Sequence, residues 1–170
     1  MDWLGVKEFI KDSFIYILLC LLVIFIVVYV VSFGQVIGPS MNNTLNNGNI
    51  ILVSKLHSKI LTIKRNDIIA FDYSGNKFLI KRVIGIENDI ISFKDNKLYI
   101  NDKLVEEDYI IPIEIKDKTY DVVPKDSYFV MGDNRGDSLD SRNFGFIKKS
   151  DIIGKVLFRI FPFDKIGTIK

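Results

Sequence analysis

Hydrophobic and polar positions divide the chain into one long apolar block and a longer region in which the two kinds alternate. The block, FIYILLCLLVIFIVVYVVSF at residues 14–33, contains no charged side chain. Its twenty residues would span roughly 30 Å as an α-helix, which is the thickness of the hydrocarbon core of a bilayer. The block is too long for the apolar part of a cleavable signal peptide, and it lacks the polar face of a helix packed on a soluble core. It therefore predicts a single transmembrane helix over residues 13–33.

Beyond the block the pattern changes to short apolar segments rich in β-branched residues, separated by turn residues such as Asp95-Asn96. Such segments are typical of β-strands, and no window here has the periodicity of an amphipathic helix. We expect a mostly β chain with one antiparallel, barrel- or sandwich-like domain over residues 34–170, and a hairpin insertion across residues 86–118. The predicted strands are NIILVSKL (49–56), DIIAFDY (67–73), KFLIKRVIGI (77–86), DIISFK (89–94), KLYIND (97–102), SYFVMGD (127–133) and GKVLFRIF (154–161).

The basic residues nearest the apolar block set its expected orientation. Lys7 and Lys11 precede it, and the first charged residue after it is Lys55. Positive side chains near a membrane segment stay on the cytoplasmic side. We therefore expect residues 1–12 in the cytoplasm and residues 34–170 on the outer side of the cell membrane, in a single-pass arrangement.

Composition and charge exclude some classes of function. Of the 170 residues, 48% are hydrophobic, and the formal net charge is only +2. With so small a charge and no densely basic segment, nucleic acid is not an expected partner. Because Cys20 is the only cysteine, no intramolecular disulfide can form. It lies within the apolar block.

One lysine and one serine stand in positions that suggest chemistry. In the predicted strand KFLIKRVIGI, alternation places Lys81 on one face with Leu79 and Val83. Apolar neighbours disfavour the charged ammonium, and a neutral amine is a general base. The alternative is an edge lysine that extends into solvent. Ser40, in GPSMNN at 38–43, is likewise either an ordinary turn serine or a nucleophile.

A dense polar loop, MGDNRGDSLDSRNFG at residues 131–145, is the most informative stretch. It contains three aspartates, two arginines, two serines and three glycines, which is too many interlocking charges for a flexible linker. Asp140 is near enough to Arg142 for an ion pair, and Asp133 can reach Arg82 from the neighbouring strand. The loop therefore suggests a set of fixed polar contacts.

Three other interpretations of this loop compete with a set of fixed polar contacts. A calcium loop requires oxygen ligands at alternate positions and a late glutamate, which the loop lacks, so no metal is expected. Arg135-Gly136-Asp137 is an adhesion tripeptide, although matches of three residues often arise by chance. The third interpretation is a plain surface loop.

Taken together and in this order, the motifs resemble those of bacterial type I signal peptidases. These are membrane-bound serine proteases that remove signal peptides from exported proteins. The motif GDNRGDSLDSRNFG (132–145) matches at every position that the family usually fixes, and the resemblance covers nearly the whole chain. The matching motifs are GPSMNNTL (38–45), NDIIAF (66–71), KRVIG (81–85), GDNRGDSLDSRNFG (132–145) and GKVLFRIFPF (154–163).

The resemblance implies a serine–lysine dyad that works without histidine or any cofactor. Ser40 is the implied nucleophile, in a loop with Gly38 and Met41, and Lys81 is the general base. Ser138 is expected to form a hydrogen bond with the lysine amine and to orient it. The only histidine, His57, lies in a polar stretch and is expected at the surface. The implied supporting ion pairs are Arg82 with Asp133 and Asp140 with Arg142.

The resemblance also implies the partners. The substrates would be signal peptides of secretory preproteins, bound as an extended strand with shallow pockets for small residues one and three places before the cut. The expected pairing edges are residues 35–39 and 78–81. The lipid bilayer is the second expected partner.

At several positions the sequence departs from the family pattern. Gly38 stands where many relatives carry a hydroxyl that stabilises the oxyanion, so the second oxyanion donor is unassigned. Asn43 replaces a usual proline, and Asn66 replaces a customary glycine. A Pro-Gly-Asp turn is replaced by Glu-Asn-Asp at 87–89.

Two rival functions remain from the sequence alone. The serine–lysine fold is shared with self-cleaving repressors and with conjugation-associated peptidases, but a repressor should carry a DNA-binding domain where this chain has its apolar block. The other rival is a membrane-anchored β-domain that binds peptides without cleaving them. That rival predicts that the purified protein leaves a preprotein intact.

Overall fold

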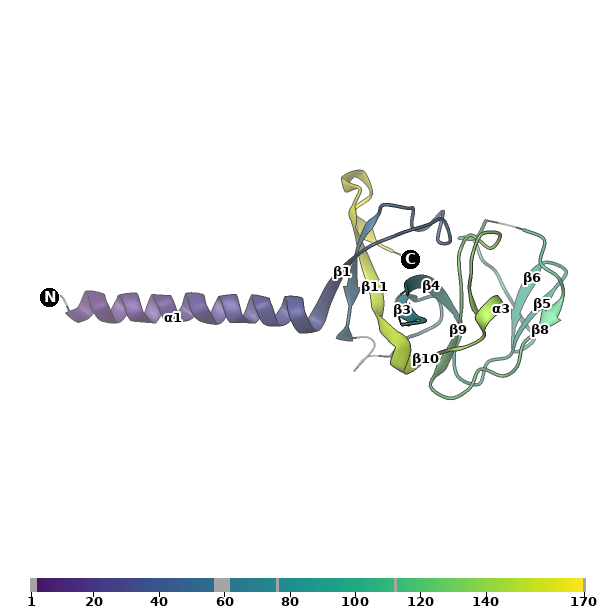
Figure 1. Cartoon of the computed structure of the whole chain (residues 1–170), viewed down its shortest axis with the longest axis horizontal. Coiled ribbons are helices and arrows are strands. Elements are labelled where there is room, and N and C mark those ends of the chain that lie inside the picture. Colours follow the sequence, from purple (N-terminus) through teal and green to yellow (C-terminus); the bar gives the residue numbers. More distant parts are fainter. Residues whose placement is uncertain (1–2, 57–61, 76, 112, 170) are drawn as a thin grey trace.

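A computed structural model describes residues 3–56, 62–75, 77–111 and 113–169, so His57 lies outside the described residues. Figure 1 shows a long helix projecting from a β-rich body. The helices are α1 (Trp3–Phe25), its π-helical continuation η1 (Ile26–Val30), α3 (Ser141–Phe144) and two 3₁₀ turns, η2 (Lys149–Asp151) and η3 (Phe163–Lys165). The strands are β1 (Val31–Gln35), β2 (Ile50–Ser54), β3 (Ile68–Tyr73), β4 (Lys77–Gly85), β5 (Ile91–Lys94), β6 (Lys97–Ile100), β7 (Lys103–Val105), β8 (Lys118–Thr119), β9 (Ser127–Met131), β10 (Ile147–Lys148), β11 (Ile152–Phe161) and β12 (Gly167–Thr168).

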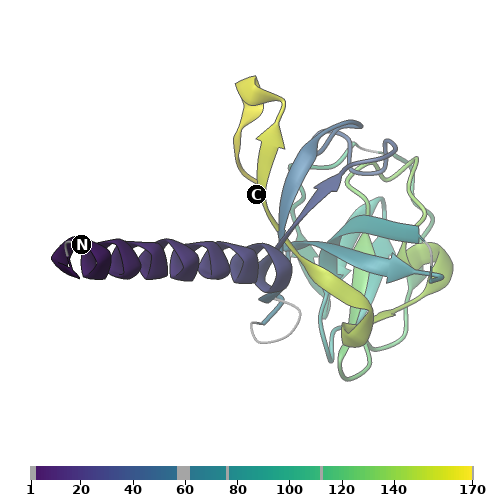
Figure 2. The ribbon, with the colours of Figure 1, turned by 60° about the vertical axis from the view of Figure 1, so that its left-hand side comes forward.

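From Phe14 to Val30 the long helix has apolar side chains on every side and no charged residue. Gly5–Val30 is long and apolar enough to cross a membrane, and none of its most apolar window is buried against the rest of the protein. Figure 2 shows the helix standing clear of the β-strands along most of its length. A helix that is hydrophobic all round needs an apolar surrounding, which a bilayer provides.

The helix ends before the apolar block does. The sequence predicts helix as far as residue 33, whereas residues 31–33 begin β1, which pairs antiparallel with β2. The backbone N–H of Lys55 donates to the carbonyl of Val30, and its Nζ donates to the carbonyl of Val28, both at 2.8 Å. The last carbonyls of a helix need such partners. The chain therefore passes from helix to sheet without a linker.

The larger sheet contains the strand of Lys81 and the strand that leads into the polar loop. Its order is β1-β2-β11-β3-β4-β9-β10, with β12 paired to β11, and all of the pairings are antiparallel. This arrangement places β4, the strand of Lys81, between β3 and β9. Directly from the end of β9 the chain enters the loop of residues 132–145, which is called the catalytic loop hereafter, after the role that the resemblance implies for it.

A smaller sheet, with the order β7-β6-β5-β8, lies at the end of the molecule farthest from α1 (Figure 1). The region expected as a hairpin insertion, residues 86–118, therefore contains a meander of three strands and reaches a fourth at Lys118–Thr119. Positive φ angles at Asp95 and Asn96, between β5 and β6, confirm the tight turn that the sequence predicts there.

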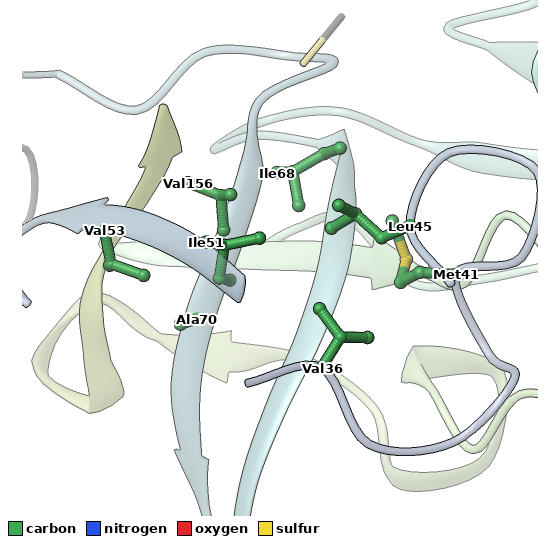
Figure 3. Packing of buried hydrophobic residues seen from close by; sticks show 8 residues of the cluster. All are labelled: Val36, Met41, Leu45, Ile51, Val53, Ile68, Ala70 and Val156. Atoms are coloured by element: carbon green, nitrogen blue, oxygen red, sulfur yellow. The ribbon is translucent and has the colours of Figure 1, made fainter. Parts of the chain in front are cut away.

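All seven predicted strands are present, and the fold is the predicted mostly antiparallel β-domain behind an apolar helix. Three clusters of buried apolar side chains form the core. The first of them, shown in Figure 3, joins side chains of the loop after β1 to strands β2, β3 and β11. Its buried members are Val36, Met41, Leu45, Ile51, Val53, Ile68, Ala70 and Val156.

Candidate active site

The turn that carries Ser40 is anchored on both sides of the serine. Gly38 has a φ of +90°, a left-handed conformation that glycine adopts without strain, and its N–H donates to Oδ1 of Asn47 at 3.0 Å. On the other side, Met41 and Leu45 are buried in the core cluster of Figure 3. The core therefore fixes the backbone around Ser40, whose own side chain is half-buried.

Lys81 reaches this turn from the middle of β4. Its Nζ lies 2.7 Å from Oγ of Ser40 and donates a second hydrogen bond to the carbonyl of Ile80 at 3.1 Å. The predicted alternation along β4 holds, since Leu79 and Val83 pack in one core cluster and Ile80 in another. The expected nucleophile and the expected base are thus in direct contact.

The surroundings of Lys81 favour the neutral amine. The residue is only 2% exposed, and none of the ion pairs among the described residues involves it. Burial lowers the pKa of Lys81 from 10.5 to about 8, although the nearby carboxylates of Asp140 and Asp133 act in the opposite direction. A useful fraction of the amine is therefore unprotonated near neutral pH, as a general base requires.

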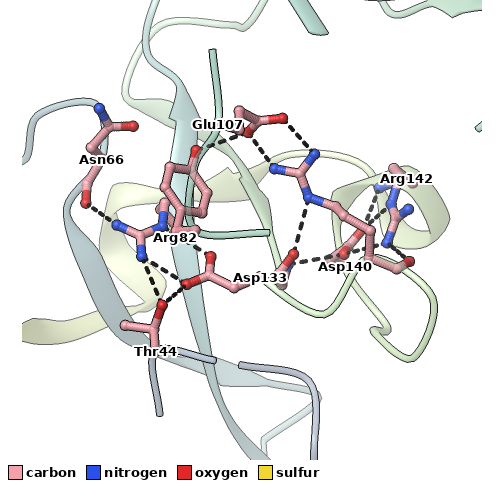
Figure 4. Close-up of polar contacts among 10 residues, drawn as sticks. Thr44, Asn66, Arg82, Glu107, Asp133, Asp140 and Arg142 are labelled. Atoms are coloured by element: carbon pink, nitrogen blue, oxygen red, sulfur yellow. Dashed lines mark hydrogen bonds and ion pairs between the residues drawn. The ribbon is translucent and has the colours of Figure 1, made fainter. Parts of the chain in front are cut away.

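Asp133 fixes the start of the catalytic loop to β4 (Figure 4). Arg82 donates to both of its carboxylate oxygens, from Nε at 2.9 Å and from Nη2 at 2.7 Å, with both side chains almost fully buried. Thr44, from the nucleophile turn, donates to the same carboxylate at 2.5 Å. The expected pair of Arg82 and Asp133 thus joins three parts of the site.

Asp140 organises the second half of the loop. Its carboxylate accepts hydrogen bonds from Nε and Nη2 of Arg142, from the hydroxyl of Ser138 and from the N–H of Gly132. Burial by itself raises the pKa of Asp140, but the bonds and charge of Arg142, with the Ser138 and Gly132 donors, hold it below its usual value. The residue therefore stays ionised, and it also caps the short helix α3.

Ser138 lies near the dyad, but it is bonded elsewhere. Among the hydrogen bonds of the described residues, its hydroxyl donates to Asp140 at 2.7 Å, and the expected bond with Lys81 is absent. A Cβ placed on Gly132 would lie 2.2 Å from Oγ of Ser138 and 2.4 Å from the carbonyl oxygen of Ser40. Ser138 and Ser40 are therefore both packed against the same glycine.

Four residues of the site's polar contacts have no role in the sequence-based prediction: Thr44, Glu107, Tyr109 and Arg135. Thr44 lies within the motif GPSMNNTL around Ser40, so the sequence did contain a signal that could have identified it as a site residue. Arg135 is 2% exposed and paired with Glu107, and an adhesion tripeptide needs an accessible arginine. No group of three or more His, Cys, Asp or Glu side chains among the described residues is arranged to hold a metal ion.

The departures from the family pattern have a backbone explanation. Asn43 has a φ of +81°, which a proline cannot adopt, because its ring holds φ near −65°. Asn66 and Asn88 have φ angles of +69° and +70°, and asparagine tolerates this region better than other non-glycine residues. Each asparagine thus fits the backbone at its position.

Comparison with known proteins agrees with this geometry. The profile of the family described as signal peptidase, peptidase S26, matches residues 6–161. The chain belongs to this family. It is 41% identical to signal peptidase I of Bacillus caldolyticus, over 76% of this chain and 79% of that protein. It is 33% identical to signal peptidase IB of Staphylococcus aureus, over 94% and 93% of the two chains.

A solved structure supports the same assignment. A signal peptidase I from Enterococcus faecalis matches with a TM-score of 0.50 and 36% sequence identity, over 55% of this chain and 96% of that one. The chain is therefore a signal peptidase I, a serine endopeptidase that removes signal peptides. The N-terminal apolar helix is consistent with a membrane anchor.

Proposed function

We propose that this signal peptidase works through Ser40 as nucleophile and Lys81 as general base. The contact of 2.7 Å between Nζ of Lys81 and Oγ of Ser40 carries this proposal. As Oγ attacks the scissile carbonyl, its proton passes to the neutral amine, and the resulting ammonium then protonates the leaving amine. The products of this step are an ester at Ser40 and the freed mature protein.

The second half of the reaction uses the same lysine. The neutral Lys81 takes a proton from water, the hydroxide adds to the ester carbonyl, and Oγ of Ser40 leaves with the proton returned by the amine. The signal peptide departs with a carboxylate. The backbone N–H of Ser40 is one donor for the developing oxyanion.

Ser138 is proposed as a positioning residue that acts on Lys81 through its surroundings. Its hydroxyl holds Asp140 on the side of Gly132, and Gly132 packs against the carbonyl of Ser40. This contact keeps the catalytic loop close to the dyad. Burial of Lys81 depends on that closeness, since water at the amine would favour the ammonium.

The substrate strand is proposed to lie between residues 35–39 and 78–81. β9 pairs with β4 only from Arg82 onward, so residues 78–81 pair with β3 alone on one side of the strand. The segment 35–39 leaves the edge strand β1 and carries the exposed Ile37. An unpaired edge binds an extended peptide through main-chain hydrogen bonds, and small side chains before the cut suit a shallow surface.

The proposed topology keeps residues 1–12 in the cytoplasm, residues 13–30 in the membrane segment and the β-domain outside, and this domain begins with β1 because residues 31–33 pair with β2. Lys7 and Lys11 are the only basic side chains on the N-terminal side of the apolar block. The exposed rings of Phe161 and Phe163 are proposed to meet the lipid surface. Nucleic acid has no part in this proposal.

The direct test uses the full chain purified in detergent and a secretory precursor. Mass measurement of the product should show one new amino terminus directly after a small residue. Ser40→Ala and Lys81→Ala should each leave the precursor intact while the thermal melting temperature stays nearly unchanged. Full processing by either variant would rule out the dyad, and an intact precursor with the wild-type chain would favour a peptide-binding role.

A further inference from the structure

Arg135 lies in the middle of the catalytic loop, yet the proposed mechanism does not use it. Its side chain is buried, and its Nε donates to the carbonyl of Gly132 at 3.1 Å. Both of its terminal nitrogens donate to the carboxylate of Glu107, with Nη1 at 2.8 Å from Oε2. A bidentate arginine–carboxylate pair of this kind fixes geometry as well as charge. Arg135 therefore ties the loop to a residue outside it.

Glu107, labelled in Figure 4, belongs to the segment that follows β7 of the smaller sheet, and Tyr109 lies two residues further along this segment. The hydroxyl of Tyr109 donates to Oε1 of Glu107 at 2.8 Å. The guanidinium carbon of Arg82 lies 3.9 Å from the centroid of the Tyr109 ring, a cation–π contact. One short segment thus reaches both Arg135 and Arg82.

The same segment also holds the loop backbone. The N–H of Ile111 donates to the carbonyl of Asp133 at 3.1 Å, and Ile111 forms an isolated parallel β-bridge with Asn134. Asn134 in turn donates its N–H to the carbonyl of Ser40 at 3.1 Å. Residues 107–111 therefore connect the smaller sheet to the nucleophile through the first residues of the catalytic loop.

We propose that residues 107–111 act as a clamp on the catalytic loop, in which Glu107 and Tyr109 are positioning residues for the reaction of Ser40 with Lys81. This inference rests on the proposed serine–lysine mechanism. The clamp does not touch the dyad. It holds Arg135 and Arg82, the two arginines through which the first half of the loop is fixed to the rest of the domain.

The clamp matters because Lys81 needs a closed loop. The charged groups that face the amine are the carboxylates of Asp133 and Asp140, each held by its own arginine. Without Glu107, Arg135 would be a buried cation with no carboxylate, and the loop would have to move to hydrate it. Water entering with that movement would reach Lys81 and favour its ammonium form.

The test compares Glu107→Gln with Glu106→Gln in the full chain, purified in detergent and given a synthetic signal-peptide substrate from pH 6 to pH 10. Glu106 is the adjacent exposed residue of the same type, so its variant should match the wild type. For Glu107→Gln, the acid limb of kcat/KM should move up by about one pH unit, with kcat about tenfold lower at pH 7 and within about twofold of wild type at pH 10. KM should change by less than about twofold, because the proposed substrate edges are not altered.

Glu107→Asp keeps the charge and should restore most of the wild-type profile. A folded Glu107→Gln variant with the pH profile of the wild type would overturn the clamp proposal. A decrease of kcat/KM by the same factor at every pH would overturn it as well. If Glu107→Gln gives no cooperative melt, Tyr109→Leu is tested in its place. Its kcat at pH 7 should be about threefold lower than that of the wild type. An unchanged profile there also overturns the proposal, whereas an inactive wild-type chain would instead refute the proposed mechanism.

Discussion

Lys81 and Arg82 are consecutive cations on β4, both almost fully buried, and their surroundings are opposite in kind. Arg82 donates to both carboxylate oxygens of Asp133 and to the carbonyl of Asn66. Lys81 donates to a hydroxyl and a carbonyl, and it belongs to none of the ion pairs of the described residues. A buried charge is costly unless an opposite charge compensates it. The same strand therefore keeps the charge on Arg82 and disfavours it on Lys81.

The difference extends into the catalytic loop. Asp133 and Asp140 both lie close enough to Lys81 to raise its pKa, which opposes the effect of burial. Each is occupied by an arginine, and that positive charge offsets the attraction that the carboxylate exerts on the lysine proton. The ion pairs thus hold the loop together, and burial of Lys81 outweighs the stabilisation that the two carboxylates give to its ammonium form.

The largest expected effect comes from exchanging each cation for methionine. Lys81→Met should lower kcat/KM by about 1,000-fold or more, because the base is lost, while the free energy of unfolding at pH 8 changes by less than about 1 kcal/mol. Arg82→Met should lower the free energy of unfolding by about 3–5 kcal/mol, because it leaves Asp133 buried without a partner. Urea unfolding and a cleavage assay on both proteins measure the contrast.

A matched control for these variants is Lys77→Met, at the exposed start of the same strand. It should change neither activity nor stability by a measurable amount, since surface substitutions stay within about 0.5 kcal/mol. Equal destabilisation by Lys81→Met and Arg82→Met would contradict the view that only Arg82 is compensated by an opposite charge.

The next effect concerns the point where loop and nucleophile meet. Gly132→Ala puts a methyl group 2.2 Å from Oγ of Ser138 and 2.4 Å from the backbone carbonyl of Ser40, and the carbonyl cannot move without the turn. We expect a loss of about 100-fold in kcat, since small misplacements of a nucleophile are costly. Gly136→Ala is the control in the same loop, because its methyl group meets no backbone atom and comes no closer than 3.1 Å to the exposed Ile113 side chain. Equal activities of the two variants would show that the loop tolerates displacement at Gly132.

Most of the β-fold was predictable because its strands are apolar, short and separated by turn residues. The end of the helix was not, since residues 31–33 continue the apolar composition of the block without interruption. Pairing with β2 and the two bonds from Lys55 decide where the helix stops. These long-range contacts cannot be predicted from local composition.

The residues of the candidate site also divide into those that the sequence predicts and those that it does not. Ser40, Lys81 and the two arginine–aspartate pairs lie in motifs with a strong local pattern, and the structure brings them together. Glu107 lies in an ordinary acidic stretch, EEDYIIP, and its partner Arg135 is 28 positions away. Its contact depends on how the smaller sheet packs against the catalytic loop, which periodicity and turn signals do not specify.

The smallest expected effect is the pH dependence of cleavage and of stability that Lys81, but not Arg82, should produce. Because burial lowers the pKa of Lys81 to about 8, kcat/KM should fall about tenfold per pH unit below that value, as the amine becomes protonated. Between about 8 and the ordinary lysine value, the unfolded chain binds more protons than the folded one, so the contribution of Lys81 to stability rises with pH across that window. The difference in unfolding free energy between wild type and Lys81→Met should therefore shift in favour of the wild type from pH 8 to pH 10. A cleavage rate that stays flat from pH 9 to pH 6 would show that the base is not a buried lysine.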